Sequence, residues 1–226
     1  MVREIVFDTE TTGFKYAEGD RLVEIGAVEL IDHVATGKIY HQYINPEREV
    51  PEDAVKVHGL TYEKLKEYPT FDKIADDWLN FIGDAKLIAH NASFDMNFVN
   101  YELKQIGKPE MSWDNCIDTL EIARNMFPGA RNSLDALCKR FEIDNSARTY
   151  HGALLDAELL SEVYLELLGG KEPTFLLNNK KEKDIKTQVV ENKKYREPRL
   201  FKIEENIDDE NAQFLEKFVK NSIWMQ

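Results

Sequence analysis

The chain has 226 residues, 42% of them hydrophobic, and its 42 acidic residues outnumber its 29 basic residues to give a formal net charge of −13. This length and composition allow one sizeable core and do not require two full domains. The negative charge repels nucleic acid at long range, so such a partner would need bound divalent metal ions or a confined basic patch. Cys116 and Cys138 lack metal-ligand spacing and no apolar run approaches membrane-spanning length, which predicts a cytoplasmic protein with no membrane partner.

The first part of the chain is predicted to form strands. Residues 3–8 are an apolar run typical of a buried strand, and a polar turn follows at residues 11–20. Two further stretches rich in β-branched residues predict strands at 22–31 and 38–44. Short polar loops, such as Asp32-His33 and Thr36-Gly37, join these strands. The fold is therefore expected to open with an antiparallel meander.

After residue 70 the pattern becomes helical and alternates with short strands. Residues 71–82 carry apolar side chains at the spacing of one buried helix face. Short strands are predicted at 86–89 and 116–118, with a polar turn at 90–93. Further helices are predicted at 94–106, 119–126, 133–141 and 153–168. Strands first and βα units later predict an α/β fold with a mixed sheet flanked by helices.

The chain changes character after Gly170. Residues 171–198 include a run of basic residues with few large apolar ones, which predicts a flexible linker. Within residues 199–226, a strand is expected at 200–203, and a helix is expected to present Phe214, Leu215, Phe218 and Val219 on one face. That face can pack on the domain itself or dock onto another protein. The predicted flexible linker before this helix favours docking onto another protein.

Five residues form the constellation that points to chemistry. Asp8 and Glu10 stand two apart on a strand, so both carboxylates point to one face, and their repulsion is relieved by a cation. Asp95 begins a helix that follows a short strand, where it can join the same cluster. Asp156 lies in the early turns of the last helix, and His151 comes just before that helix. Four carboxylates and one imidazole are therefore expected to converge.

These residues carry a resemblance to a known family. The four acids, with the histidine at His-x4-Asp spacing, resemble the DEDDh exonucleases of the ribonuclease-H-like superfamily. The stretches FDTETTG, HNASFD, residues 126–165 and the terminal SIW resemble the proofreading subunits of bacterial replicative DNA polymerases. The resemblance implies a ribonuclease-H-like domain with a five-stranded mixed sheet at residues 1–170. It also implies 3′→5′ hydrolysis of mismatched DNA ends.

The resemblance also implies roles for the five residues. Two divalent cations are expected, and oxygen ligands favour Mg²⁺ or Mn²⁺ over zinc. By this resemblance Asp8 bridges both ions, Glu10 and Asp156 hold the ion beside the nucleophile, and Asp95 supports the second. His151 is then the base that takes a proton from the attacking water, because an imidazole can accept a proton near neutral pH.

Contacts with the terminal nucleotide follow from the same resemblance. His58, which precedes a glycine, can equally be a turn residue. A frayed single-stranded 3′ end enters such a pocket more easily than a paired end, so fraying alone would select mismatches. The expected substrate-binding residues are Asp8, Glu10, Thr11, His58, Asn91, Phe94 and Asp156.

The expected partners are a DNA 3′ end and the polymerase catalytic subunit, the latter through residues 199–226. Members of the family often carry a glutamine-led segment that binds the sliding clamp. The corresponding stretch here, GGKEPTFLLNN, lacks the glutamine and does not support clamp contact. Two alternatives stay open: a stand-alone DEDDh nuclease that trims RNA or DNA ends, and a catalytically silent subunit that stabilises the polymerase.

Overall fold

The computed structural model describes residues 1–146, 148 and 150–169. The predicted linker at 171–198 and the predicted strand, helix and polymerase-binding segment within 199–226 lie outside the described residues. In the part that is described, none of the helices combines the length and apolar character needed to cross a membrane.

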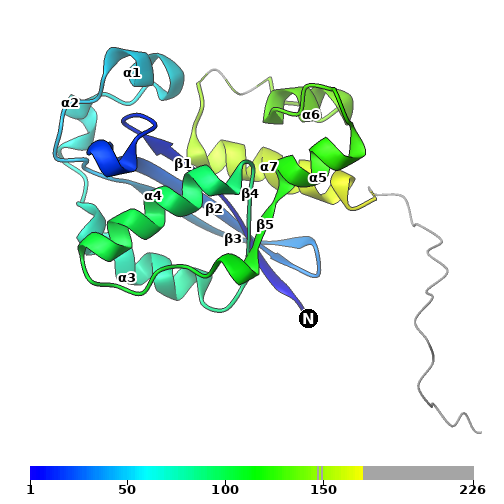
Figure 1. The fold of residues 1–226 in the computed structure, drawn as a ribbon, viewed down its shortest axis with the longest axis horizontal. Helices are drawn as coiled ribbons and strands as arrows, with labels where there is room; N and C mark the ends of the chain where they lie inside the picture. Colours follow the sequence, from blue (N-terminus) through cyan, green and yellow to red (C-terminus); the bar gives the residue numbers. More distant parts are fainter. Residues whose placement is uncertain (147, 149, 170–226) are drawn as a thin grey trace, which may run out of the picture. The chain divides into compact units, whose positions relative to one another are not determined.

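Five strands form one mixed sheet in the order β3-β2-β1-β4-β5 (Figure 1). β1 pairs antiparallel with β2, which pairs antiparallel with β3, whereas β4 runs parallel to both β1 and β5. The predicted five-stranded mixed sheet is confirmed. The strands are β1 (Arg3–Thr11), β2 (Leu22–Ile31), β3 (Val34–Tyr43), β4 (Lys86–Ala89) and β5 (Cys116–Asp118).

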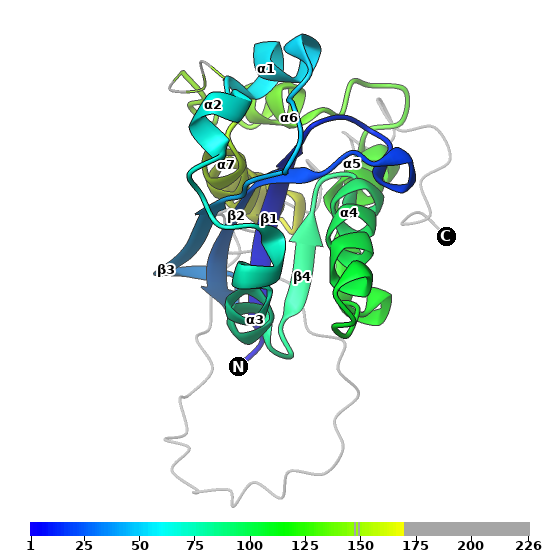
Figure 2. The ribbon, with the colours of Figure 1, turned by 90° about the vertical axis from the view of Figure 1, so that its left-hand side faces the viewer.

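Helices cover both faces of this sheet (Figures 1 and 2). Alternate residues of β1 point to opposite layers, so Ile5 and Phe7 pack with Trp78, whereas Val6 packs with Leu160. The first layer contains α3 (Phe71–Ile82) and α4 (Ala92–Gln105), and the second contains α5 (Thr119–Met126), α6 (Leu134–Arg140) and α7 (Ala153–Leu167). The remaining elements are α1 (Glu52–His58), α2 (Tyr62–Leu65), η1 (Tyr16–Glu18) and η2 (Trp113–Asn115).

Several predicted boundaries were wrong. β1 runs through Thr11, so the turn begins one residue later than expected. β3 starts at Val34 and includes Thr36-Gly37, because an irregularity in its pairing with β2 absorbs these residues instead of a loop. The helix expected from residue 94 begins at Ala92. The helix expected from residue 133 begins at Leu134, because the Ser133 side chain caps it by accepting from the Ala136 N–H.

Two helices, α1 and α2, were not predicted. Within α1 only His58 is buried, and within α2 only Leu65 is buried. A helix with so narrow a buried face gives no apolar periodicity to detect.

Candidate active site

The acidic pair lies at the carboxyl end of β1, on the face that α7 covers. Asp8 and Glu10 share this face with Val6, which packs in the α7 layer. The pairing with β2 becomes irregular between Glu10 and Thr11, and the strand ends at Thr11. The expected convergence of the pair thus follows from strand geometry.

Gly26 lets α7 approach the sheet beside this pair. It is the β2 partner of Asp8, and an added Cβ would lie 2.1 Å from the backbone nitrogen of Leu154. Only a residue without a side chain permits this approach. Asp156 lies in the first turn of α7, so the close contact carries its carboxylate to the acidic pair.

Asp95 reaches the site from the opposite layer. It lies in the first turn of α4, immediately after β4, the parallel neighbour of β1. Thr9 points to the α4 side of β1, and its Oγ1 donates to Asp95 Oδ1 at 2.6 Å. The helix is entered through Asn91, which adopts the left-handed conformation at φ 68° and donates its N–H to Asp118 Oδ1 at 3.0 Å.

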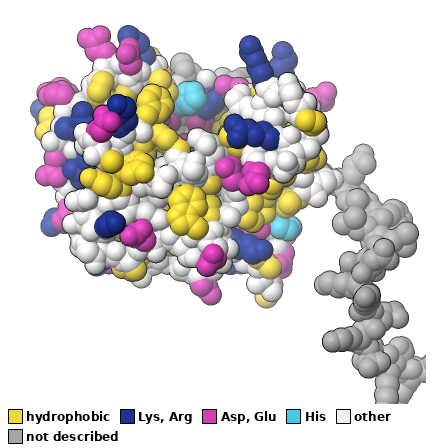
Figure 3. All heavy atoms as spheres, viewed as in Figure 1, with side chains coloured by type: hydrophobic (Ala, Val, Ile, Leu, Met, Phe, Trp, Pro, Cys, Tyr) yellow, Lys and Arg dark blue, Asp and Glu magenta, His cyan; other side chains and the backbone are white. Residues whose placement is uncertain are grey.

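These elements enclose a cavity of about 240 Å³. In Figure 3 a histidine and acidic side chains lie in a hollow between the surface over α1 and α2 and the surface over α5 and α6. The cavity lining includes all five predicted catalytic residues, together with the predicted substrate contacts Asn91 and Phe94. Thr11 and His58 are outside the lining. His58 is the buried last residue of α1 and accepts from the Leu60 N–H through Nδ1 at 3.1 Å.

The acidic cluster is short of positive charge. Burial raises the pKa of Glu10 to about 8, with Asp156, Glu24 and Asp95 adding to the rise. Burial also raises the pKa of Asp95 to about 7 and, together with Asp95, Glu10 and Asp156, raises the pKa of Asp8 well above its usual range. The pattern is that expected of carboxylates forced together in a low-dielectric site.

Asp156 differs from its neighbours because it has a cationic partner. Burial alone would raise its pKa, but polar contacts with His151 and Arg148 lower it. Both carboxylate oxygens accept from the Arg148 guanidinium, at 2.6 and 2.7 Å. Potential ligand atoms of Glu10, His151 and Asp156 lie within 4.8 Å of one another, which is close enough to share a metal ion.

Sequence reasoning missed several residues of the site. Thr9 and Arg148 both line the cavity, as do His90 and Asp135. The arginine lies three residues before His151, so proximity to a predicted base was the available signal. Phe14 is 85% exposed and its ring centroid lies 6.1 Å from that of Phe94, which adds a second aromatic surface near the predicted substrate pocket.

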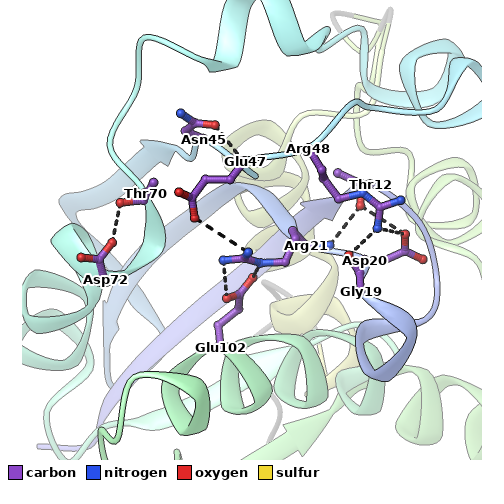
Figure 4. A network of polar contacts seen from close by, with 10 residues as sticks. All are labelled: Thr12, Gly19, Asp20, Arg21, Asn45, Glu47, Arg48, Thr70, Asp72 and Glu102. Atoms are coloured by element: carbon purple, nitrogen blue, oxygen red, sulfur yellow. Dashed lines mark hydrogen bonds and ion pairs between the residues drawn. The ribbon is translucent and has the colours of Figure 1, made fainter.

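A polar network outside the cavity fastens α4 to the start of β2 (Figure 4). The Arg21 guanidinium donates to both carboxylate oxygens of Glu102, at 2.6 and 3.0 Å. Glu102 is buried and lies seven residues after Asp95, which places both carboxylates on the same side of α4. With the Thr9 contact, α4 is therefore joined to the sheet at two points.

The same network holds the loop that follows β1 (Figure 4). Thr12 and Arg21 exchange hydrogen bonds, with Thr12 N–H donating to Arg21 O at 2.9 Å and Arg21 N–H to Thr12 Oγ1 at 3.0 Å. Asp20 Oδ1 accepts hydrogen bonds from Thr12 Oγ1 at 3.3 Å and from Arg48 Nη1 at 3.0 Å. Gly13 leaves room for this arrangement, because an added Cβ would lie 2.3 Å from Asp20 Oδ2.

Comparison with known proteins identifies the family. Residues 5–164 match the family described as Exonuclease. The chain is 56% identical over 182 residues to the DNA polymerase III subunit epsilon of Rickettsia prowazekii, covering 79% of this chain and 80% of that protein. The chain belongs to the DNA polymerase III epsilon subunits. The epsilon subunit of Escherichia coli is 48% identical over 178 residues, covering 76% of this chain and 73% of its own length.

Solved exonuclease structures share the fold of this chain. Exonuclease X in complex with 5′ overhanging duplex DNA superposes with a TM-score of 0.57 at 26% identity, covering 74% of this chain and 91% of that chain. The nuclease domain of 3′hExo, a DEDDh family member bound to rAMP, has the same fold, with a TM-score of 0.63 at 16% identity over 74% of this chain and 91% of that chain. The predicted class, a proofreading exonuclease subunit with a ribonuclease-H-like fold, is confirmed.

Proposed function

We propose that this domain removes the 3′-terminal nucleotide of DNA by metal-dependent hydrolysis at the cavity of Asp8, Glu10, Asp95, His151 and Asp156. The observation that carries the proposal is the convergence of four carboxylates on one cavity, three of them with raised pKa values. Such a cluster costs free energy unless cations or protons neutralise it.

The donor set fits divalent cations that prefer oxygen. Asp8, Glu10 and Asp156 are the proposed metal ligands, and Asp95 is the proposed support for a second ion. Carboxylate oxygens with open positions suit Mg²⁺ or Mn²⁺. Cations bound here would stabilise the negative charge that develops on the attacking and leaving oxygens of the phosphodiester.

The protein side chains then bind and orient the substrate and move a proton. The His151 side chain is 47% exposed at the cavity, where its imidazole can take a proton from the attacking water. Phe94, with the exposed ring of Phe14 nearby, offers a surface on which the terminal base can stack. Asn91 lies in the same lining, and the proposed contribution of Thr11 and His58 is from the edge of the pocket.

A polymerase is the proposed partner in the cell, because the relatives of this chain are named as subunits of DNA polymerase III. Residues 199–226 are the proposed polymerase-binding segment and residues 171–198 its tether. No clamp contact is proposed through GGKEPTFLLNN, which lacks the glutamine.

The test uses the full chain and a primer with a mismatched 3′ nucleotide. In the presence of Mg²⁺ the wild-type protein is expected to release mononucleotides, and Asp8→Ala is expected to release none. His151→Ala is expected to bind the primer and metal normally but to lose most turnover, at least the 10²-fold typical of a lost general base. His33→Ala, a matched change in the β2–β3 turn, should retain full activity.

Two outcomes would contradict the proposal. If the wild-type protein releases no more mononucleotide than Asp8→Ala, the silent structural subunit is favoured. Faster hydrolysis of an all-RNA strand assayed in parallel would favour the end-trimming nuclease over the proofreading enzyme. Wild-type turnover in His151→Ala would remove the base assignment alone.

A further inference from the structure

A buried arginine occupies the acidic site. The Arg148 side chain is 7% exposed, and its Nε and Nη2 donate to the two oxygens of Asp156 at 2.6 and 2.7 Å. Nη1 donates to Asp135 Oδ1 at 2.5 Å. Among the described residues that line the cavity, Arg148 is the only lysine or arginine. Both oxygens of a proposed metal ligand are thus already bound by a fixed positive charge.

The same guanidinium also engages the proposed base. Arg148 Nη2 lies 2.7 Å from His151 Nδ1. An arginine has donors only and stays protonated, so Nδ1 must be the acceptor in this contact. When the ring is neutral, this contact places its proton on Nε2. The distance from Nδ1 to Asp156 Oδ2 is 3.4 Å, longer than either contact that the guanidinium makes to these two groups.

This arrangement ties the proposed base and a proposed metal ligand to the same guanidinium. Arg148 Nη2 lies 2.7 Å from Nδ1 of His151 and 2.7 Å from Oδ2 of Asp156, so one donor nitrogen is shared between the proposed base and the proposed metal ligand. A divalent cation that binds Asp156 must compete with the guanidinium for the same oxygens. Displacing the guanidinium from Asp156 also removes it from Nδ1, because Nη2 makes both contacts.

We propose that Arg148 is a latch, a positioning residue that occupies both oxygens of Asp156 and Nδ1 of His151 until a divalent cation displaces it. The proposal rests on the metal-dependent function proposed above. Asp135, whose side chain is 58% exposed at the cavity, holds the guanidinium after displacement, because Nη1 already binds it. Hydrolysis is therefore coupled to metal occupancy through one side chain.

The test measures metal binding without substrate. Arg148→Met removes the donors and keeps the apolar stem, and Arg140→Met is the matched control, because Arg140 is an exposed residue of α6 that stacks on Phe127. Mn²⁺ affinity is read from the electron paramagnetic resonance signal of the free ion. Arg148→Met is expected to bind Mn²⁺ at least about tenfold more tightly, because the cation no longer has to displace a buried, bidentate guanidinium. Arg140→Met should match wild type.

A second readout uses the wild-type protein and does not depend on how the variant folds. Nitrogen NMR of labelled histidine should show His151 as the Nε2–H tautomer without metal, and Nδ1 should shift when Mg²⁺ is added. Unchanged or weaker Mn²⁺ binding in Arg148→Met, or an Nδ1 signal that Mg²⁺ leaves unmoved, overturns the latch. Wild-type protein that binds no Mn²⁺ and hydrolyses no DNA would instead overturn the proposed function itself.

Discussion

Replacing Gly26 with alanine tests whether the contact between β2 and α7 sets the geometry of the active site. The new Cβ would lie 2.1 Å from the Leu154 nitrogen and 2.3 Å from the Ala153 carbonyl carbon. Both are backbone atoms, so no side-chain rotation relieves the clash. The first turn of α7, with Asp156, must retreat by more than about 1 Å to restore van der Waals contact.

The expected loss of activity follows from this displacement. A shift of about 1 Å in a catalytic group can cost about 10²-fold in rate, which corresponds to about 2.7 kcal/mol in the activation free energy. The overpacking itself should lower the free energy of unfolding by about 1–3 kcal/mol. Gly26→Ala is therefore expected to stay folded at moderate temperature while kcat falls about 100-fold.

The assay compares kcat for release of the 3′-terminal nucleotide from single-stranded DNA at saturating Mg²⁺, with unfolding followed by circular dichroism. Gly37→Ala is the control. Gly37 has φ +82° and no neighbour within 4 Å of an added Cβ, so alanine there costs about 1–2 kcal/mol of backbone strain without touching the site. A Gly26→Ala protein with wild-type kcat would refute the positioning role, as would an equal loss of kcat in Gly37→Ala.

Two further changes test the charges of the domain. Because burial raises the pKa of Glu10 from 4.5 to about 8, the metal-free folded protein holds a proton that the unfolded chain has lost between these pH values. Its free energy of unfolding should therefore fall on the order of a few kcal/mol from pH 5 to 8, and denaturant titrations should show a smaller fall in Glu10→Gln. Arg21→Met should cost about 2–4 kcal/mol by leaving Glu102 buried without its partner, whereas Arg21→Met/Glu102→Leu should recover most of that loss in urea unfolding. A double variant no more stable than the single one would contradict this account of the ion pair.

Much of the fold was predictable because its buried faces are regular. β2, α3, β4, β5 and α5 begin and end at the predicted residues. Each of these segments has an apolar pattern matched to its own period, or is a short run between polar turns. α1 was missed for the converse reason, since His58 is its only buried residue and no stripe exists to detect.

The convergence of the five proposed catalytic residues was predictable for a different reason. The spacing of Asp8 and Glu10 on a strand predicts that their carboxylates share one face. The family pattern predicts the other three, with Asp95 and Asp156 in first helical turns and His151 just before α7. The residues that position the catalytic candidates, Gly26 and Arg148, could not be found in this way. Gly26 is in tertiary contact with Leu154, and Arg148 contacts Asp156 from a position that no periodic sequence pattern predicts. The first contact joins residues more than a hundred positions apart, and the second involves a residue outside the helices and strands.

The contacts made by Thr9 and Gly26 show why the fold can hold several mutually repelling carboxylates together. Asp95 and Asp156 arrive from opposite layers, and each is fixed near β1 by a contact that does not depend on metal. Thr9 holds Asp95 by a hydrogen bond, and Gly26 admits α7 by steric fit. Neither contact weakens when the carboxylates ionise, so the packing of two layers on one strand opposes their repulsion. The arrangement proposed to bind cations is thus held in place by the core, because the repulsion within the acidic cluster does not stabilise the fold.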